Sequence, residues 1–318
     1  MTYCPLLSDS YLVRLYAGMN KGKVDLAQSY LRRLSQVATV DADLVWVEKE
    51  LFPFLPAVFE RLLAFRRIPY VVDFDDAIFH NYDLKGAGLA RSFLANKLDG
   101  LLAHCELVTA GNNYLSNYAL AHGARSVAIV PTVVDTRRYP VRPPNRDGRI
   151  RVGWIGTPHN ERYLAPVIRA LNRLREQLPL TLVTVGAGEL KDLAIPHERH
   201  EWSEAAEGEL VAGFDIGVMP LADTPWERGK CGYKLIQYMA AARPVIASAV
   251  GVNSEIVTPQ VGLLVDADEG WERAIFELGS DHGLRAIMGA DARRRVEEFY
   301  SLDATAPKVL RLLNDVLA

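Results

Sequence analysis

The stretch from Thr224 to Ser248 holds the residues best suited to binding an anion. It opens with turn formers and charges, passes through Gly232, and continues as a predicted amphipathic helix that ends before Pro244. The first N–H groups of a helix are unpaired and lie at the positive end of its dipole, so this loop–helix junction favours a phosphate or diphosphate. Lys230 and Lys234 add positive charge. The alternative is an ordinary loop–helix unit with solvated lysines.

A second set of reactive groups is acidic. Asp73, Asp75 and Asp76 follow a short apolar run at 69–72 that predicts a strand. A carboxylate at a strand end could orient the hydroxyl group of a substrate. The alternative is a capping cluster, in which Asp75 or Asp76 is the N-cap of the next segment.

The fold must position these groups, and the pattern of apolar residues predicts alternating strands and helices. In the N-terminal half we expect strands at 43–47, 69–72, 107–109 and 126–130, with a strand remnant at 2–4, and helices at 12–16, 24–37, 54–65, 89–102 and 113–121. Such alternation indicates a parallel sheet, whose ligands bind at the carboxyl ends of the strands.

A proline-rich, charged segment at 136–148 is the best linker candidate, which puts the domain boundary near residue 145. Beyond it the pattern predicts a second, doubly wound sheet. We expect strands at 150–155, 180–185, 215–219, 245–247 and 262–265, and helices at about 161–177, at 203–211 with Ser203 as N-cap, and near the C-terminus with Ser301 as N-cap.

The composition limits the classes of function that this chain can have. At 318 residues the chain is long enough for about two domains, and a hydrophobic content of 49% with 24% charged residues is typical of a globular protein. A net charge of −3 gives no reason to expect nucleic acid, and three scattered cysteines argue against disulfides or zinc and favour a reducing cytoplasm. No apolar run reaches membrane-spanning length. The glycines at 153–156 and 186–188 do not complete a dinucleotide fingerprint, so no nicotinamide or flavin cofactor is expected.

Several segments, taken in order, carry a family resemblance. They are LVTAGNNYLSNYA, IVPTVVDTRRY, VGWIGT, DIGVMPL, GYKLIQYMAAARPVIAS and GVNSEIVTPQVGLLV. Together they resemble a GT-B glycosyltransferase, most closely the retaining family-4 enzymes. The resemblance implies an α/β fold of two Rossmann-like doubly wound domains facing a cleft. Residues 1–145 would form the acceptor side, 146–318 would bind the nucleotide-sugar, and a helix at about 302–318 would pack back on the first domain. The N-terminal domain is expected to lack its first βα unit.

The resemblance also assigns donor-binding residues. The family's two glutamates around the loop–helix match Gly229 and Gln237, so both carboxylates are missing here. Gln237 is expected to bind the ribose through its amide, and Glu227 to replace the first carboxylate. The remaining donor-binding residues are expected to be Gly156, Thr157, Lys230, Cys231, Gly232, Tyr233 and Lys234, with Lys230 the better placed of the two lysines.

On the acceptor side the family often places a histidine where Asp75 stands, so we expect Asp75 to act on the acceptor hydroxyl, with Asp73 and Asp76 in support. His80 is the poorer candidate, and His159 could reach a phosphate. Arg61, Arg66 and Arg67, beside Phe52, Phe54 and Phe59, predict a solvated helix face or a peripheral site for anionic lipid.

The resemblance implies a cytoplasmic enzyme, without metal or cofactor, that moves a sugar with retention from a nucleotide-sugar to a glycan or lipid-linked acceptor in polysaccharide or glycolipid synthesis. Three alternatives stay open. Asp73 and Asp75 match the metal-binding pair of the single-domain GT-A architecture, the same fold serves nucleotide-sugar epimerases, and the missing glutamates suit a non-catalytic binding protein.

Overall fold

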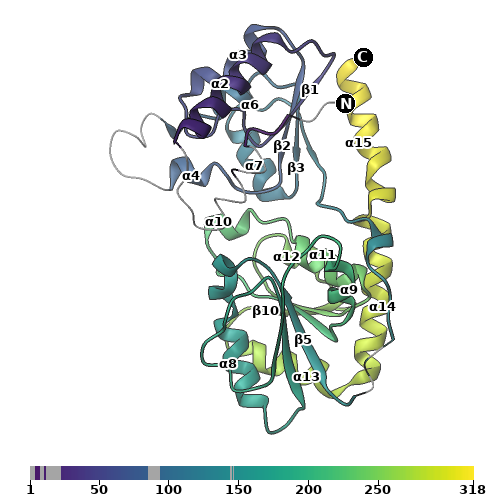
Figure 1. Cartoon of the computed structure of the whole chain (residues 1–318). Coiled ribbons are helices and arrows are strands. Elements are labelled where there is room, and N and C mark those ends of the chain that lie inside the picture. Colours follow the sequence, from purple (N-terminus) through teal and green to yellow (C-terminus); the bar gives the residue numbers. More distant parts are fainter. Residues whose placement is uncertain (1–3, 8–10, 12–22, 85–93, 144, 146) are drawn as a thin grey trace.

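A computed structural model describes residues 4–7, 11, 23–84, 94–143, 145 and 147–318. It consists of two α/β domains, one above the other in Figure 1. The helix predicted at 12–16, the first two residues of the strand remnant and the start of the helix predicted at 89–102 lie outside the described residues.

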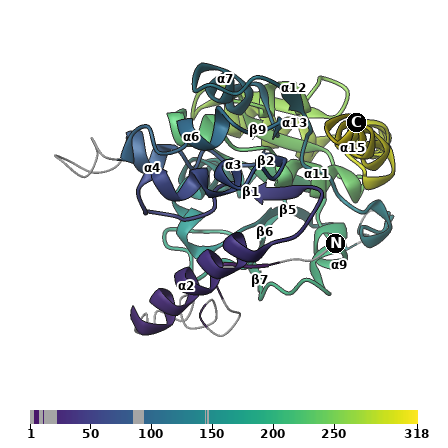
Figure 2. The same ribbon diagram turned by 90° about the horizontal axis from the view of Figure 1, so that it is seen from above.

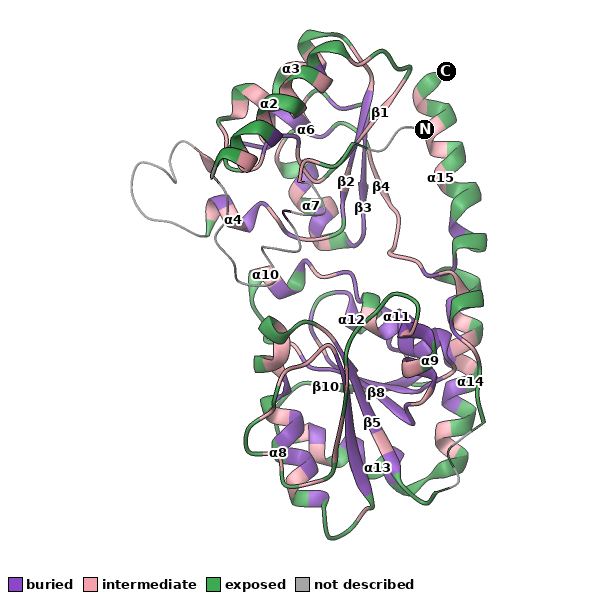
Figure 3. Cartoon of the chain, in the orientation of Figure 1, coloured by how far each residue is buried: buried purple, intermediate pink, exposed green. Residues whose placement is uncertain are grey.

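The N-terminal domain is built on a parallel sheet in the order β1-β2-β3-β4, so its described strands follow one another in chain order. These strands are β1 (Val45–Glu48), β2 (Tyr70–Phe74), β3 (Leu107–Ala110) and β4 (Val127–Ile129). Around them lie α2 (Lys23–Thr39), the 3-10 helix η1 (Ala57–Arg61), α3 (Leu62–Phe65), α4 (His80–Asp83), α6 (Asp99–Leu102) and α7 (Asn113–Ala121). All residues of β2 and β3 except Asp73 are buried, as expected for parallel strands covered on both faces (Figure 3).

The C-terminal domain has a parallel sheet in the order β10-β9-β8-β5-β6-β7. Its strands are β5 (Ile150–Ile155), β6 (Leu180–Val185), β7 (His197–His200), β8 (Ile216–Met219), β9 (Val245–Ser248) and β10 (Gly262–Val265). The direction of winding reverses between β5 and β8, which is the position where open α/β sheets bind ligands. The sequence does not predict β7, because this edge strand is polar and partly exposed.

The helices of this domain are η3 (Pro158–Leu164), α8 (Ala165–Leu174), α9 (Glu207–Ala212), α10 (Pro225–Arg228), α11 (Tyr233–Ala240), α12 (Asn253–Ile256), α13 (Gly270–Ser280), α14 (His282–Phe299) and α15 (Leu302–Leu317). The N-cap predicted at Ser301 is confirmed, since its hydroxyl accepts a bond from Ala304 N at 3.1 Å.

Three predicted helices have different bounds. The one expected at 54–65 is η1 followed by a single turn, α3. The one expected at 161–177 is η3 followed by α8, because proline in the first turn of α8 has no N–H to continue a preceding helix. The one expected from Ser203 begins at Glu207 after a turn, in which Ser203 Oγ accepts from Ala206 N.

The segment between the sheets, predicted as a linker, is bound to the C-terminal domain. It contains η2 (Thr136–Arg138), and Arg138 and Asn145 donate to the carbonyl groups of Glu204 and Gly213. The chain passes back toward the N-terminal domain at the start of α15. There Ser301 forms an isolated parallel bridge with Val134 of the first connection. α15 then runs beside the N-terminal domain, where Lys308 Nζ donates to Ile129 O at 2.7 Å (Figure 1).

Candidate donor and acceptor site

The carboxyl ends of strands from both sheets meet at the interface between the domains. The loop Gly229–Gly232, hereafter the donor loop, lies against residues that follow β2 and β3. Lys230 Nζ is 3.6 Å from Asp76 Oδ2, and a Cβ atom at Gly229 would overlap the Cβ atom of Ala77. The donor loop therefore faces the opposite domain, as a site shared by the two domains requires.

Gly232 begins α11 in the left-handed conformation, with φ of 69°. Glycine adopts this conformation without strain, and a Cβ atom here would also overlap Ile256. In the described part of the chain no side chain caps α11, while Tyr233 at its first position is exposed. The junction therefore offers backbone N–H groups to a ligand, as the sequence predicts for such a turn.

Cys231, between the lysine and the glycine, is a packing residue. Its thiol is buried against Gly111, and burial raises its pKa to about 12. A thiol with this pKa stays protonated near neutral pH, so the structure gives Cys231 no nucleophilic character.

Lys234 has no counter-ion among the described residues. Its Nζ atom lies 4.5 Å from the centroid of the Trp154 ring, and a Cβ atom at Gly156 would lie only 2.7 Å from it. Burial, with the charge of Lys230, lowers the pKa of Lys234 to about 7. Among the described residues no carboxylate is within ion-pair distance of Lys234, whereas Lys230 is paired with Asp76. The expectation that Lys230 is the better placed lysine stays a prediction, and the unpaired Lys234 is a second candidate for contact with a phosphate.

Two glycine turns adjoin Lys234 at the ends of β5 and β6. Gly156 N donates to Val185 O at 3.0 Å, and Gly186, with φ of 81°, lies so close that a Cβ atom would be 2.6 Å from Gly156 O. Thr157 is exposed and begins η3. A Cβ atom at Gly156 would lie 2.6 Å from the Trp154 ring and 2.7 Å from Lys234 Nζ. The glycine therefore lets these two side chains pack against the backbone at the end of β5.

Gln237 is buried within α11 and bonded to a polar network. Its Nε2 donates to the hydroxyl of Tyr139 at 3.0 Å, and that hydroxyl donates to Glu207 at 2.6 Å. Trp202 Nε1 donates to the other oxygen of Glu207 at 2.7 Å. One N–H of the Gln237 amide is engaged with Tyr139, so the ribose contact stays a prediction that would use the second N–H or the amide oxygen. Periodicity could not reveal Tyr139 and Glu207, because they meet Gln237 only in the fold.

Glu227 is buried on the C-terminal side of the interface. It accepts hydrogen bonds from the hydroxyl groups of Thr224 and Tyr163. Burial raises its pKa, but these two bonds and Lys230 outweigh that effect and leave the pKa below its usual value. Glu227 is therefore ionised and fixed near the donor loop, with Tyr163 as a partner that the sequence does not predict.

The three acids form the opposite side of the interface. Asp73 accepts a bond from the Thr109 hydroxyl at 2.5 Å, and burial raises the pKa of Asp73 to about 6, against the lowering effect of that bond. Asp75 pairs with Lys49 at 3.0 Å. Neither Asp75 nor Asp76 caps α4, which begins after Phe79 without a side-chain cap, although Asp76 Oδ1 accepts a bond from Ala77 N at 3.1 Å in the turn before it.

His80 is buried and already engaged. One ring nitrogen bonds Asp83 at 2.8 Å, and the other bonds the hydroxyl of Tyr114 at 2.9 Å. Both nitrogens are therefore unavailable to an acceptor unless Tyr114 relays the proton. His159 is exposed on η3. In the described ranges no group of three or more His, Cys, Asp or Glu residues could hold a metal ion.

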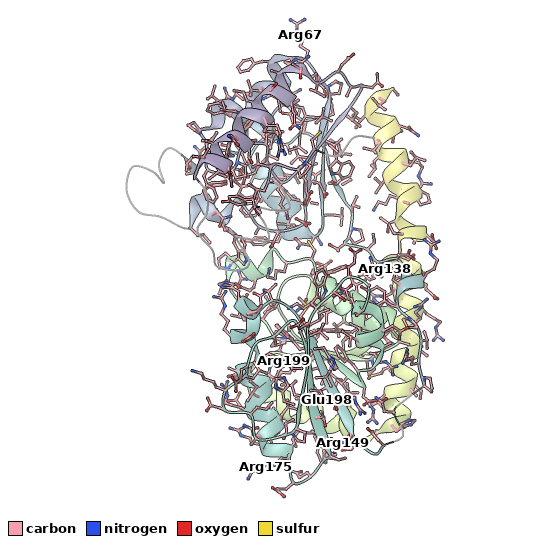
Figure 4. All side chains as sticks on the ribbon, viewed as in Figure 1. Arg67, Arg138, Arg149, Arg175, Glu198 and Arg199 are labelled. Atoms are coloured by element: carbon pink, nitrogen blue, oxygen red, sulfur yellow. The ribbon has the colours of Figure 1, made fainter. Side chains whose placement is uncertain are left out.

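The proposed lipid-docking patch is only partly present. Phe52 is in the core, and Arg66 is tied to the carbonyl groups of Val37 and Val40, while Phe54 is exposed. Figure 4 shows Arg67 at the end of the N-terminal domain farthest from the interface. No helix in the described ranges is both long and apolar enough to cross a bilayer.

Residues 149–281 match the family model described as glycosyl transferases group 1. No curated protein matches by sequence. The fold resembles sucrose-phosphate synthase from Thermosynechococcus elongatus, with a TM-score of 0.71 and 15% identity over 94% of this chain and 80% of that chain.

Two further structures show the same similarity. HepE from Anabaena, in complex with UDP, has a TM-score of 0.70 and 15% identity over 91% of this chain and 82% of its own. TarM has a TM-score of 0.68 and 15% identity over 93% of this chain and 62% of its own. The chain thus has the GT-B fold, and its C-terminal domain carries the group 1 glycosyltransferase signature. The single-domain GT-A alternative is wrong.

Proposed function

We propose that the protein is a glycosyltransferase that transfers a sugar from a nucleotide-sugar to an acceptor hydroxyl. The observation that carries this proposal is Lys234, a half-buried lysine without a carboxylate partner in the described chain, which lies in the first turn of α11 and beside the turn at Gly156. A diphosphate would supply the missing counter-ion. The matched family and the UDP and UDP-glucose complexes of HepE support this type of donor.

The chemistry requires positioning more than a dedicated nucleophile. As the bond between sugar and phosphate stretches, negative charge grows on the leaving diphosphate, and Lys234, Lys230 and the amides at Gly232 would stabilise it. We infer retention, as in the family-4 enzymes. Glu227 is held by two hydroxyl groups on the donor side, where it would contact the sugar.

On the acceptor side, Asp73 and Asp75 would orient the attacking hydroxyl. Asp73 is half-desolvated with a pKa near 6, so it is mainly ionised at neutral pH and can accept a proton. We propose a glycan or lipid-linked acceptor in polysaccharide or glycolipid synthesis at the cytoplasmic face of the membrane, with no metal or cofactor.

The function is tested by incubating the protein with UDP-, GDP-, ADP- and dTDP-sugars and measuring thermal stabilisation, followed by donor hydrolysis and transfer. Binding to the folded form raises the melting temperature. Stabilisation and turnover by one donor class are expected, and both should be lost in Lys234→Met. Binding without hydrolysis or transfer would instead indicate a non-catalytic binding protein.

A further inference from the structure

Asn112 belongs to the N-terminal domain, yet it is bonded to the donor loop of the other domain. Its Oδ1 atom accepts from Leu115 N at 2.9 Å and so caps α7. Its Nδ2 atom donates to the carbonyl oxygens of Gly229 at 3.2 Å and Lys230 at 3.0 Å. One buried side chain, only 3% exposed, therefore holds a helix start and the donor loop together.

These bonds fix the direction of the loop peptides. In a planar trans peptide the C=O and N–H groups point to opposite sides. Because Asn112 turns the Lys230 carbonyl toward α7, the N–H of Cys231 must point away from α7. The orientation of an amide beside Gly232 is thus set by a residue of the opposite domain.

The packing between the donor loop and the N-terminal domain is close on both sides of Asn112. A Cβ atom at Gly111 would overlap the sulfur of Cys231, and one at Gly229 would overlap Ala77. Without the Asn112 amide, the carbonyl oxygens of Gly229 and Lys230 would lose these hydrogen bonds. That loss would destabilise the present conformation of the loop. Asn112 therefore stabilises this shape of the loop while the domains are in contact.

We propose that Asn112 is a positioning residue for the donor. It fixes the donor loop so that the loop amides and Lys230 are presented to the diphosphate, and the donor site is complete only when the domains are in contact. This inference rests on the proposed function. It assigns to Asn112 a role separate from capping, because the cap uses only Oδ1 while the loop uses only Nδ2.

The variants Asn112→Ser and Asn112→Ala separate the two roles, since serine keeps an oxygen for the cap but has no amide. Asn113→Ala is the matched control, because it removes only the exposed interdomain bond to Glu255 at 3.2 Å. Hydrogen exchange of free protein is the first measurement. We expect amide exchange in residues 229–235 to be about tenfold faster in Asn112→Ser, with α7 unchanged, from loss of one or two hydrogen bonds.

The second measurement is titration with UDP, GDP, ADP and dTDP. We expect the nucleotide that binds the wild-type protein to bind both Asn112 variants about tenfold more weakly, and Asn113→Ala normally. If the wild-type protein binds none of the four, both proposals fail. If it binds one and Asn112→Ser binds it equally well with unchanged exchange, only the role of Asn112 fails. An equal loss in Asn113→Ala would assign the effect to domain contact in general and also refute that role.

Discussion

The Lys234 ammonium group lies over the face of the Trp154 ring, 4.5 Å from its centroid, and no carboxylate of the described chain neutralises it. The indole face attracts a cation but cannot replace the hydration that burial removes. Lys234 is therefore poised to gain from an anionic ligand more than the paired Lys230 does.

Replacing Lys234 with methionine should weaken nucleoside-diphosphate binding by at least tenfold, because the ligand loses its desolvated cation. Calorimetric titration with UDP, GDP, ADP and dTDP measures the effect. Lys191→Met, at an exposed position of the same domain, is the control and should bind normally. Equal affinity of the two variants would remove Lys234 from the donor site.

Nucleotide binding should also depend on pH. The pKa of Lys234 in the free protein is about 7, and a bound diphosphate raises it. Binding above pH 7 then requires proton uptake, so affinity should fall between pH 7 and 9. Titrations in buffers of different ionisation enthalpy detect that uptake, which Lys234→Met should abolish. In the free protein the lowered pKa means that the unfolded state binds more protons, so this group makes stability rise from about pH 7 to 10.

Asp73 should give the acidic limb of the rate profile. Its pKa is about 6, so the carboxylate that can accept a proton forms as pH rises through 6. The value of kcat/KM should rise over that range, and the limb should disappear in Asp73→Asn. Stability should change in the opposite direction to the rate. Because the pKa of Asp73 is raised in the folded state, its contribution to the free energy of unfolding is present below about pH 4 and lost as pH rises through 6. An unchanged limb in Asp73→Asn would assign it to another group.

Gly156→Ala should impair donor binding without unfolding the domain. The new methyl group would lie 2.7 Å from Lys234 Nζ and 2.6 Å from the Trp154 ring, so the flexible lysine must move. We expect weaker nucleotide binding with a nearly unchanged circular-dichroism spectrum. Gly283→Ala, where the nearest atom would be 3.3 Å away, is the control. Full affinity in Gly156→Ala would show that Lys234 does not need its present position.

Lys97→Met tests a buried ion network remote from the donor loop. Lys97 is completely buried and pairs with Glu50 at 2.5 Å and with Glu60. Removing the cation leaves two carboxylates without a counter-ion, although Glu60 keeps its bonds from Leu51 N and Phe52 N and Glu50 its bond from Tyr82. The free energy of unfolding should therefore fall by about 3–5 kcal/mol in urea titrations. Arg169→Ala, which breaks an exposed pair with Asp268, should cost less than about 1 kcal/mol. Similar losses in both variants would contradict this account.

The sequence predicts the fold because apolar strands such as 150–155 and 180–185 alternate with amphipathic helices, and both strands are confirmed at these bounds. It also predicts the turn at Gly232. It could not predict β7, whose side chains are polar, nor the bond from Asn112 to Lys230, which joins residues distant in the chain. Spacing places Lys230 and Lys234 one turn apart, but only the fold shows that Lys234 lies over the Trp154 ring while Lys230 is paired with Asp76.

The bridge between Val134 and Ser301 restricts how the molecule can open. The chain passes between the domains there twice, and the two crossings are joined by hydrogen bonds of 3.0 Å from Val134 N to Tyr300 O and from Leu302 N to Val134 O. α15 marks this side, whereas α4 lies at the opposite edge of the molecule (Figure 2). The domains therefore separate by rotation about the side of the molecule that carries α15. The edge of the interface between α4 and α10 then opens the most. Substrates would enter, and the spent nucleotide would leave, through that edge.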